Sequence, residues 1–519
     1  MKQVMPIVMC LALGLLAACT RAEEDGVDET INTPTAFELP VVEHVVIIGI
    51  DGMGGLFFEG PTTPTLDKLM LEAAYSLTMQ NVLPTSSSTN WMSMVNGQGT
   101  DGHGVYSNGW SVGESAPADT IVKILREQRP DSTIGVFHDW GDFGRLVEDN
   151  VADIKEDPGD ENETAAAAID FIKNTKPTLT FIHLDHVDHA GHATGWVKNN
   201  DDCLIPGGCP YVEAVEEADA LVSEILTAIE DAGIQDKTAV LISADHGGMF
   251  LGHGGDTYDE RCIPFIVTGP GVKPGLITRT PRIFDIPATA AALLGLDIPD
   301  AWVGRPVLDA FQGYVLPQSQ NELVDYQLVQ DYTRLYDDTG SGANEDLSLW
   351  RPVVPDDYHA LGDVAVSGSR DAPSFSVPVI KESTLALVEP IGYELLWSDE
   401  GSGSDSEDSG EGISLWHGIA PAGYTCLGVY AFTGYTQIPK TNATRCIHDD
   451  YLVAGERSMI WTDAGSGADL DAAIWSCQAN TDEQVATHTF ISRRSALDGG
   501  MDLCRSLTAS GLRLVSGAQ

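Results

Sequence analysis

TAVLISADHGGMFLGHGGD, residues 238–256, is the stretch on which the interpretation of this sequence depends. It opens with the apolar run Ala239–Ile242 and then breaks into Asp245 and His246, with His253 seven residues later. Buried strands of open α/β sheets present their functional groups just past their carboxyl ends. Asp and His are ligands that suit Zn²⁺ or a similar divalent ion. Taken alone, the stretch fits a metal site and a polar turn with exposed histidines equally well.

Apolar runs alternate with segments of helical spacing on both sides of this stretch. We expect strands within residues 41–51, 133–138, 178–188, 239–242 and 262–269, and helices within 65–74, 115–128, 164–174, 211–233 and 286–294. Continuous apolar strands that alternate with helices indicate a mostly parallel sheet covered on both faces. The predicted fold class is α/β, in a domain that spans residues 41–310.

A threefold repeat follows, from residue 326 to about 515. YDDTGSG, WSDEGSG and WTDAGSG begin at Tyr336, Trp397 and Trp461, and each leads to a β-like run that ends in Trp. Three β repeats of about 60 residues favour a closed, pseudo-threefold all-β module such as a β-prism.

The composition is strongly acidic. The chain has 77 Asp and Glu against 28 Lys and Arg, which gives a formal net charge of −49. This charge argues against a nucleic-acid-binding face. An anionic substrate would also meet a repulsive field, so its site needs local positive charge, which metal ions would supply.

The first residues have the features of an export signal. Lys2 precedes the apolar run Met5–Ala18, which is too short to span a bilayer and ends at Cys19 in a pattern that resembles the bacterial lipobox. We therefore expect a lipoprotein signal over residues 1–19, with a plain secretory signal cleaved near Ala18 as the alternative. Thr20 after the cysteine favours the outer membrane of a Gram-negative bacterium. Residues 20–40 are polar and aperiodic, as in a flexible tether.

Export permits disulfides, and the cysteines fall into neighbouring pairs. The candidate pairs are Cys203 with Cys209, Cys426 with Cys446, and Cys477 with Cys504. Spacing alone does not establish this connectivity. Cys262 would remain as a buried free thiol.

A second ligand-rich segment follows the strand near residue 180. Asp188 and His192 are four residues apart, so one helical turn would direct both at a single ion. Asp185 and His189 have the same spacing and form the rival pair. We interpret the surplus histidines of residues 183–189 as structural.

A third ligand, Asp51, ends the first strand, and a run of hydroxyls follows it at Pro84–Trp91, PTSSSTNW. Hydroxyls and backbone N–H groups at a helix N-terminus offer an anion site and a nucleophile position. The same run would also serve as helix caps. A hydroxyl is a weak nucleophile unless a metal or a base activates it, which connects the serines to the Asp and His residues.

Five motifs in order resemble the alkaline phosphatase superfamily, and most closely its type I phosphodiesterase/nucleotide pyrophosphatase branch. They are Asp51-Gly52, PTSSSTNW, Asp188-x-x-Gly191-His192, Asp245-His246-Gly247 and Gly252-His253-Gly254. The resemblance covers about residues 41–308. It implies a zinc-dependent hydrolase of phosphoric mono- or diesters, acting on a small substrate.

The resemblance also implies the site residues. It places the nucleophile at Ser87, with Ser86 and Ser88 adjacent, and a phosphoryl-binding amide at Asn90. It implies two Zn²⁺ ions, although other divalent ions would also suit the ligands. One would be held by Asp188, His192 and His253, and the other by Asp51, Asp245, His246 and Ser87. The sequence departs from the family at Thr89, where Pro is usual, and at Trp91, where His is common.

Three rival functions remain. A sulfatase would need Cys- or Ser-x-Pro-x-Arg, which does not occur at Ser87; a mutase on this scaffold would need a large inserted domain. Alternatively, the protein is a surface lipoprotein that binds a ligand through its β module. That module resembles the Vps62-related family over about residues 327–477, and the resemblance identifies no ligand.

Overall fold

The computed structural model describes part of the chain. The described residues are 37–55, 57, 60–110, 119–197, 209–277, 280–314, 323–338, 341–368, 371–383, 386–402, 412–421, 423–435, 439, 444–468, 472–479, 481, 483–493 and 504–515. The described residues from Leu39 onward belong to one compact unit. The predicted signal and Cys203 lie outside the described residues.

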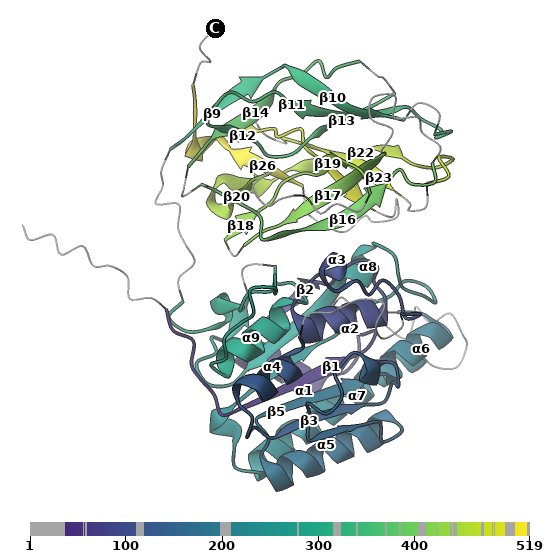
Figure 1. Cartoon of the computed structure of the whole chain (residues 1–519), viewed down its shortest axis with the longest axis vertical. Helices are drawn as coiled ribbons and strands as arrows, with labels where there is room; N and C mark the ends of the chain where they lie inside the picture. Colours follow the sequence, from purple (N-terminus) through teal and green to yellow (C-terminus); the bar gives the residue numbers. More distant parts are fainter. Residues whose placement is uncertain are drawn as a thin grey trace, which may run out of the picture. The chain divides into compact units, whose positions relative to one another are not determined.

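An eight-stranded sheet forms the centre of the first domain (Figure 1). Its order is β4 (Ile154–Glu156), β3 (Ile134–His138), β5 (Leu179–Leu184), β1 (His44–Ile50), β6 (Thr238–Ser243), β7 (Cys262–Thr268), β2 (Ala74–Gln80) and β8 (Gly275–Leu276). The four neighbours β3, β5, β1 and β6 are parallel, and β7 is antiparallel to both β6 and β2. β1, β5 and β6 are buried along their whole length, which explains their continuous apolar sequences.

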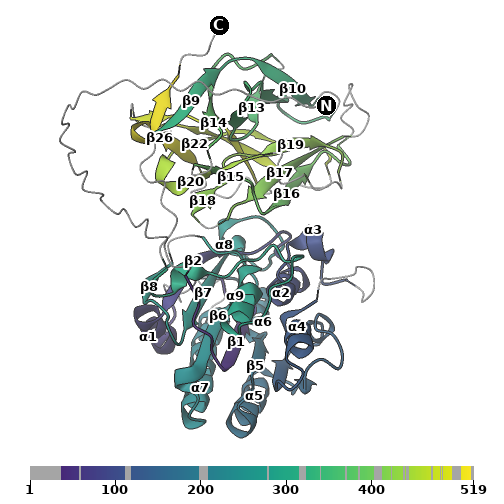
Figure 2. The same cartoon turned by 60° about the vertical axis from the view of Figure 1, so that its left-hand side comes forward.

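Helices cover both faces of this sheet (Figure 2). One set packs around α7, and the other contains α2, α4 and α9. The helices are α1 (Pro64–Glu72), α2 (Ser87–Asn96), α3 (Thr100–His103), α4 (Ile121–Gln128), α5 (Glu161–Thr175), α6 (His186–Thr194), α7 (Pro210–Asp231), α8 (Tyr258–Arg261) and α9 (Asp285–Leu293). The predicted α/β class is confirmed.

Two details differ from the expectation. The strand β2 was not predicted, although AYSLTMQ alternates apolar Tyr75, Leu77 and Met79 with polar Ser76, Thr78 and Gln80, which is the period of a strand. The segment expected as one strand over residues 178–188 changes to helix at His186, the start of α6.

Six small sheets make up the second domain in two sets of three. The first set is β10 (Tyr332–Asp337), β11 (Leu347–Pro352) and β13 (Val364–Ser367); β16 (Gly392–Ser398), β17 (Ile413–Ile419) and β19 (Tyr430–Thr433); and β22 (Glu456–Thr462), β23 (Ala473–Gln478) and β25 (Phe490–Arg493). The second set is β9 (Val324–Val329), β12 (Tyr358–Ala360), β14 (Val377–Lys381) and β27 (Leu512–Leu514); β15 (Leu387–Val388), β18 (Tyr424–Thr425) and β20 (Cys446–His448); and β21 (Leu452–Ala454), β24 (Gln484–Val485) and β26 (Arg505–Thr508).

The sequence repeat is visible in these pairings. The first strand of each repeat, β10, β16 or β22, carries a register shift just before an aromatic residue. These residues, Tyr336, Trp397 and Trp461, are buried in one shared core, where Trp397 makes edge contacts with both of the others. Each repeat therefore contributes an equivalent hairpin and one equivalent aromatic side chain.

The cysteines match the expected pairs as far as the structure describes them. Cys426 bonds Cys446, and Cys477 bonds Cys504. Cys209 is also in a disulfide. Cys262 is a buried thiol that accepts a hydrogen bond from Gln80 Nε2 at 3.1 Å. In the described part of the chain, no helix is both long and apolar enough to cross a membrane.

Candidate metal centre and nucleophile

The carboxyl ends of the central parallel strands bring the first ligand group together. Asp51 follows β1, while Asp245 and His246 follow the neighbouring strand β6. His246 Nε2 lies 3.4 Å from Asp51 Oδ1 and 3.1 Å from Asp245 Oδ2. Ligand atoms of all three lie within 4.8 Å of one another, which is close enough to hold one ion.

A second group adjoins the first. α6 presents Asp188 and His192 one turn apart, with His192 Nε2 3.4 Å from Asp188 Oδ2. His253 Nε2 lies 3.1 Å from His192 Nε2 and 3.6 Å from Asp188 Oδ1. The rings of His246 and His253 stack with centroids 3.7 Å apart, so the two ligand groups are in direct contact.

Of the rival pair, Asp185 has a ligand atom within 4.8 Å of ligand atoms of Asp51 and His183, whereas His189 takes no part in this arrangement. His189 Nε2 contacts Asp185 Oδ2 at 3.0 Å, but the His189 side chain is 74% exposed. The structure thus collects Asp188 and His192 rather than Asp185 and His189 beside His253.

Ser87 is the first residue of α2, and its side chain reaches the first ligand group. Its Oγ lies 3.2 Å from His246 Nε2. The other hydroxyls of the run have different contacts: Ser86 Oγ pairs with Thr89 Oγ1 at 2.8 Å, and Thr85 Oγ1 donates to the Gly255 carbonyl at 2.7 Å. Among these hydroxyls, Ser87 is therefore the one that contacts a ligand histidine.

Asn90 does not have the role that the sequence predicts. It is fully buried, and its Nδ2 donates to the carbonyls of Pro84 and Ser86, both at 3.1 Å. Its Oδ1 accepts the Val82 N–H at 2.8 Å. Both amide hydrogens are used, so Asn90 shapes the turn before α2 and has no hydrogen left for a phosphoryl oxygen.

Asn108 carries an amide that faces Ser87 Oγ, and it was not among the predicted site residues. Its Nδ2 lies 3.5 Å from Ser87 Oγ, and its Oδ1 accepts the Ser88 N–H at 2.8 Å. Arg145 supports this loop by donating to the Trp110 carbonyl at 3.0 Å. The sequence signal was weak, because Asn108 lies in a short polar segment, SNG, that is typical of any turn.

Two buried side chains orient Asp51. Trp91 Nε1 donates to Asp51 Oδ2 at 2.9 Å, which gives the departure from the family pattern at this position a structural role. His183 lies between two carboxylates, with Nε2 3.4 Å from Asp51 Oδ2 and Nδ1 3.1 Å from Asp139 Oδ1. His183 therefore connects Asp51 to Asp139 and helps to hold Asp51 in position.

Gly52 allows the first strand to approach α6. Its φ is +71°, and a Cβ here would lie 2.7 Å from the Asp188 Cα. Any side chain would displace α6 and separate Asp188 from the other ligands. The Gly52 N–H also donates to Asp245 Oδ1 at 3.1 Å.

The carboxylates crowd one another. Burial, followed by Asp51 and Asp185, raises the pKa of Asp188 to about 9. Burial, followed by Asp51 and Asp188, raises the pKa of Asp245 well above its usual value. Burial also lowers the pKa of His246 to about 3, so this imidazole is neutral near pH 7. Ionising these carboxyls beside neutral imidazoles becomes favourable when a cation lies among them.

The hydrogen bonds support the same conclusion. Asp51 Oδ1, Asp188 Oδ1 and Asp245 Oδ2 are buried and have no hydrogen-bond partner among the described residues. Unpaired buried oxygens are costly, and here they adjoin imidazole nitrogens. This donor set fits Zn²⁺ or a related divalent ion.

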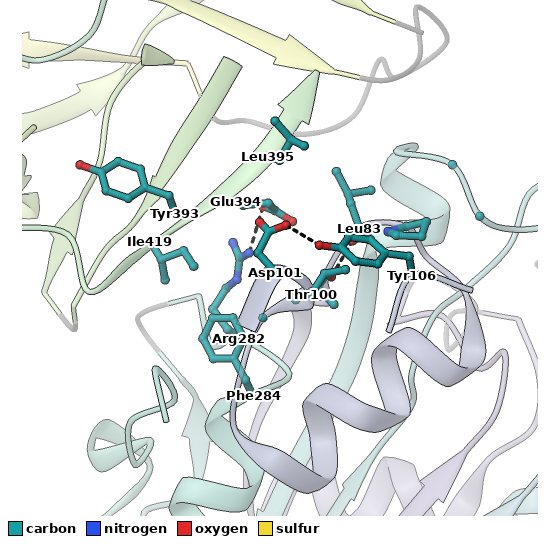
Figure 3. Close-up of a pocket in the computed structure, with 15 residues that line it drawn as sticks. Leu83, Thr100, Asp101, Tyr106, Arg282, Phe284, Tyr393, Glu394, Leu395 and Ile419 are labelled. Atoms are coloured by element: carbon teal, nitrogen blue, oxygen red, sulfur yellow. Dashed lines mark hydrogen bonds and ion pairs between the residues drawn. The ribbon is translucent and has the colours of Figure 1, made fainter. Parts of the chain in front are cut away.

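A cavity of about 500 Å³ borders the loops that carry these residues. Pro84, three residues before Ser87, and Gly254, next to His253, form part of its lining. The second domain contributes Tyr393, Leu395 and Ile419, and Figure 3 shows these side chains opposite Phe284 and Arg282. Arg282 Nη2 pairs with Glu394 at 3.1 Å, so the cationic group at this wall is neutralised.

Two family models match the sequence. That of type I phosphodiesterase / nucleotide pyrophosphatase matches residues 45–120 and 117–256, and that of vacuolar protein sorting-associated protein 62 matches residues 322–500. The chain joins an alkaline phosphatase superfamily domain to a Vps62-like domain.

Curated relatives match parts of the alkaline phosphatase-like domain. Phosphopentomutase of Methylobacterium sp. (strain 4-46) is 38% identical over 95 residues, which are 18% of this chain and 21% of that one. Human arylsulfatase A is 25% identical over 241 residues, or 42% of this chain and 41% of that one. The chain thus spans well under two thirds of these relatives.

Solved structures include enzymes of two chemistries. Murine ectonucleotide pyrophosphatase / phosphodiesterase 5 in complex with AMP is 14% identical, with a TM-score of 0.40, over 50% of this chain and 96% of that one. A 2-O GAG sulfatase is 14% identical, with a TM-score of 0.44, over 65% of this chain and 84% of that one.

Proposed function

We propose that the protein is a metal-dependent hydrolase of phosphoric esters with Ser87 as its nucleophile. The observation that carries the proposal is the position of Ser87 Oγ, at the start of α2 and 3.2 Å from His246 Nε2 in the first ligand group. A hydroxyl at a helix N-terminus beside metal ligands suits attack on an anionic phosphoryl group.

The ligand groups suit two divalent ions. Asp51, Asp245 and His246 would hold one ion with Ser87, and Asp188, His192 and His253 would hold the other. When bound, the ions would favour the deprotonated hydroxyl and neutralise the charge of the phosphoryl group.

The side chains then divide the work. Ser87 Oγ attacks phosphorus, the ester oxygen leaves, and a phosphorylated Ser87 forms that water later cleaves. Asn108 Nδ2, 3.5 Å from Ser87 Oγ, donates to a non-bridging oxygen of the substrate. Trp91 and His183 keep Asp51 in place. Most of the rate enhancement in this type of reaction comes from such positioning and charge stabilisation.

Sulfate ester hydrolysis is the second candidate, because arylsulfatases match the same domain. The residues around Ser87 favour phosphate. A sulfatase would carry Pro at position 89 and Arg at position 91, where this chain has Thr89 and Trp91. Both have other contacts: Thr89 pairs with Ser86, and the Trp91 indole donates to Asp51.

The cavity favours diesters as substrates. Its apolar lining, which includes Leu83, Phe284 and Leu395, begins beside Pro84 and Gly254, close in the chain to Ser87 and His253. An uncharged organic group on phosphorus would lie there, since Arg282 is neutralised by Glu394. The Vps62-like domain would thereby form one wall of the substrate site.

Rates on p-nitrophenyl phosphate, bis-p-nitrophenyl phosphate and p-nitrophenyl sulfate, with added Zn²⁺, test the proposal. Ser87→Ala should abolish phosphoester turnover and retain the metal content. Ser88→Ala is the matched control, because Ser88 is adjacent and buried. Full activity of Ser87→Ala would refute the nucleophile assignment, and a preference for the sulfate ester would refute the phosphate assignment.

Export and lipid anchoring remain part of the proposal. They rest on the run Met5–Ala18 before Cys19. Cys19→Ser should release the protein from the membrane fraction of a Gram-negative host and prevent its labelling with radioactive fatty acid. Unchanged labelling would contradict the anchor.

A further inference from the structure

A further cluster of ligand-type side chains adjoins the site already described. Its members are Asp139, which follows the end of β3, Glu161, which begins α5, and His186, which begins α6. One ligand atom of each lies within 4.8 Å of the other two. The ring of His183 separates this cluster from Asp51, because its two nitrogens face Asp51 and Asp139.

Asp139 is held firmly. Its side chain is 4% exposed, and Oδ1 lies 3.1 Å from His183 Nδ1. Its Oδ2 accepts the Asp185 N–H at 3.1 Å. These contacts fix the carboxylate at the carboxyl edge of the sheet, one strand further along than the ligands that follow β5 and β1.

His186 has one nitrogen available. Its Nε2 lies 3.0 Å from the Ala214 carbonyl, which only accepts hydrogen bonds, so Nε2 carries the proton. Its Nδ1 then has a free lone pair, and this atom is buried without a hydrogen-bond partner among the described residues. Asp139 accepts the two hydrogen bonds described above, and Glu161 Oε1 accepts one from Asn162 Nδ2 at 3.0 Å, but none of these donors reaches His186 Nδ1.

We propose that Asp139, Glu161 and His186 bind a third divalent cation. One imidazole nitrogen and two carboxylate oxygens suit Zn²⁺ or Mn²⁺, with water at the remaining positions. The ion would fasten the first turns of α5 and α6 to the end of β3. Because α6 also carries Asp188 and His192, the cation would position catalytic ligands without contacting substrate. The proposal does not depend on which ester the protein hydrolyses.

Metal analysis of the purified full chain tests this. After equilibration with Zn²⁺ or Mn²⁺ and removal of free metal, mass spectrometry should find one ion more per chain in the wild type than in Glu161→Gln or His186→Gln. The matched control is His189→Gln, on the same helix but 74% exposed, which should bind as many ions as the wild type. Equal metal content in the wild type, Glu161→Gln and His186→Gln would overturn the proposal.

A measurement on the wild type avoids dependence on variants that fail to fold. Crystals grown with Mn²⁺ or Zn²⁺ should show an anomalous scattering peak bounded by Asp139, Glu161 and His186. A map with peaks only at the groups of Asp51 and Asp188 would overturn the third site. Loss of ester hydrolysis in any variant leaves this readout unaffected.

Discussion

Buried carboxylates in the two domains have opposite surroundings. In the Vps62-like domain, Asp363 is fully buried and accepts two hydrogen bonds from Arg351 and one from the Ala431 N–H, each at 2.8 Å. In the alkaline phosphatase-like domain, Asp51 and Asp245 each leave one buried oxygen without a hydrogen bond among the described residues. The first arrangement stabilises the fold, while the second leaves binding capacity for a ligand.

The largest expected effect comes from removing a crowded carboxylate. Asp245→Asn should lower kcat/KM by about 10³-fold, because a metal ligand and its charge are lost. The melting temperature of the metal-free protein should rise, because Asp51 and Asp188 lose a like-charged neighbour. Kinetics and thermal unfolding in a chelator measure both. A drop in the melting temperature of the metal-free protein would contradict the expectation that Asp245 destabilises the fold when no metal is bound.

The matching change in the other domain should destabilise. Asp363→Asn leaves the Arg351 guanidinium without its carboxylate, and we expect the free energy of unfolding to fall by about 3 kcal/mol. Urea unfolding followed by fluorescence measures the loss. The metal content of the folded protein should stay unchanged, and a stability equal to that of the wild type would contradict the expectation.

Replacing Asn108 should mainly affect the rate of the reaction, whereas replacing Asn90 should mainly affect the stability of the same domain. Asn108→Ala should lower kcat/KM by about 10²-fold, the usual cost of one donor to the transition state. Its melting temperature should change little, since the Asn108 side chain has one short hydrogen bond, from the Ser88 N–H at 2.8 Å, and one long one, to Ser87 Oγ at 3.5 Å. Asn90→Ala should mainly lower the melting temperature, because three hydrogen bonds of the buried turn are lost. Wild-type kinetics for Asn108→Ala would show that Asn108 does not donate the hydrogen bond to the substrate oxygen.

The hydrogen bond from Trp91 to Asp51 should make a smaller contribution, which is to metal affinity. Trp91→Phe retains an aromatic ring but loses the N–H donated to Asp51. We expect the affinity for the metal beside Ser87 to fall about 10-fold, as for other groups that orient a ligand. Competition with a chelator measures this. The second proposed ion, at Asp188, His192 and His253, serves as the internal control and should keep its affinity.

The smallest expected effect concerns Glu394 and the pH dependence of the free energy of unfolding. Burial would raise the pKa of Glu394, but Arg261 and Arg282 hold it well below its usual value. Because the folded-state pKa lies below the unfolded value, this stabilisation is complete above about pH 4.5 and is lost as the pH falls. Unfolding between pH 7 and pH 3 should show a weaker pH dependence for Glu394→Gln than for the wild type, and equal slopes would contradict it.

The structure gathers the predicted ligand residues at one edge of the sheet. Asp51, Asp188, Asp245, His246 and His253 each follow or closely succeed a strand, and parallel strands end at the same edge of a sheet. The same logic failed for the asparagines. Asn90 and Asn108 are both polar residues in or next to turns. Nothing in the neighbouring sequence shows which side-chain amide donates its hydrogen bonds to backbone carbonyls.

Periodicity alone determined the α/β class, the threefold repeat of the second domain and the strand ends that carry ligands, because these are local properties of the chain. Tertiary structure decided which histidine of α6 meets His253, which amide faces Ser87, and that His183 connects two carboxylates. It also collected Asp139, Glu161 and His186 into one cluster. Such choices depend on distances between segments far apart in the sequence, and packing sets those distances.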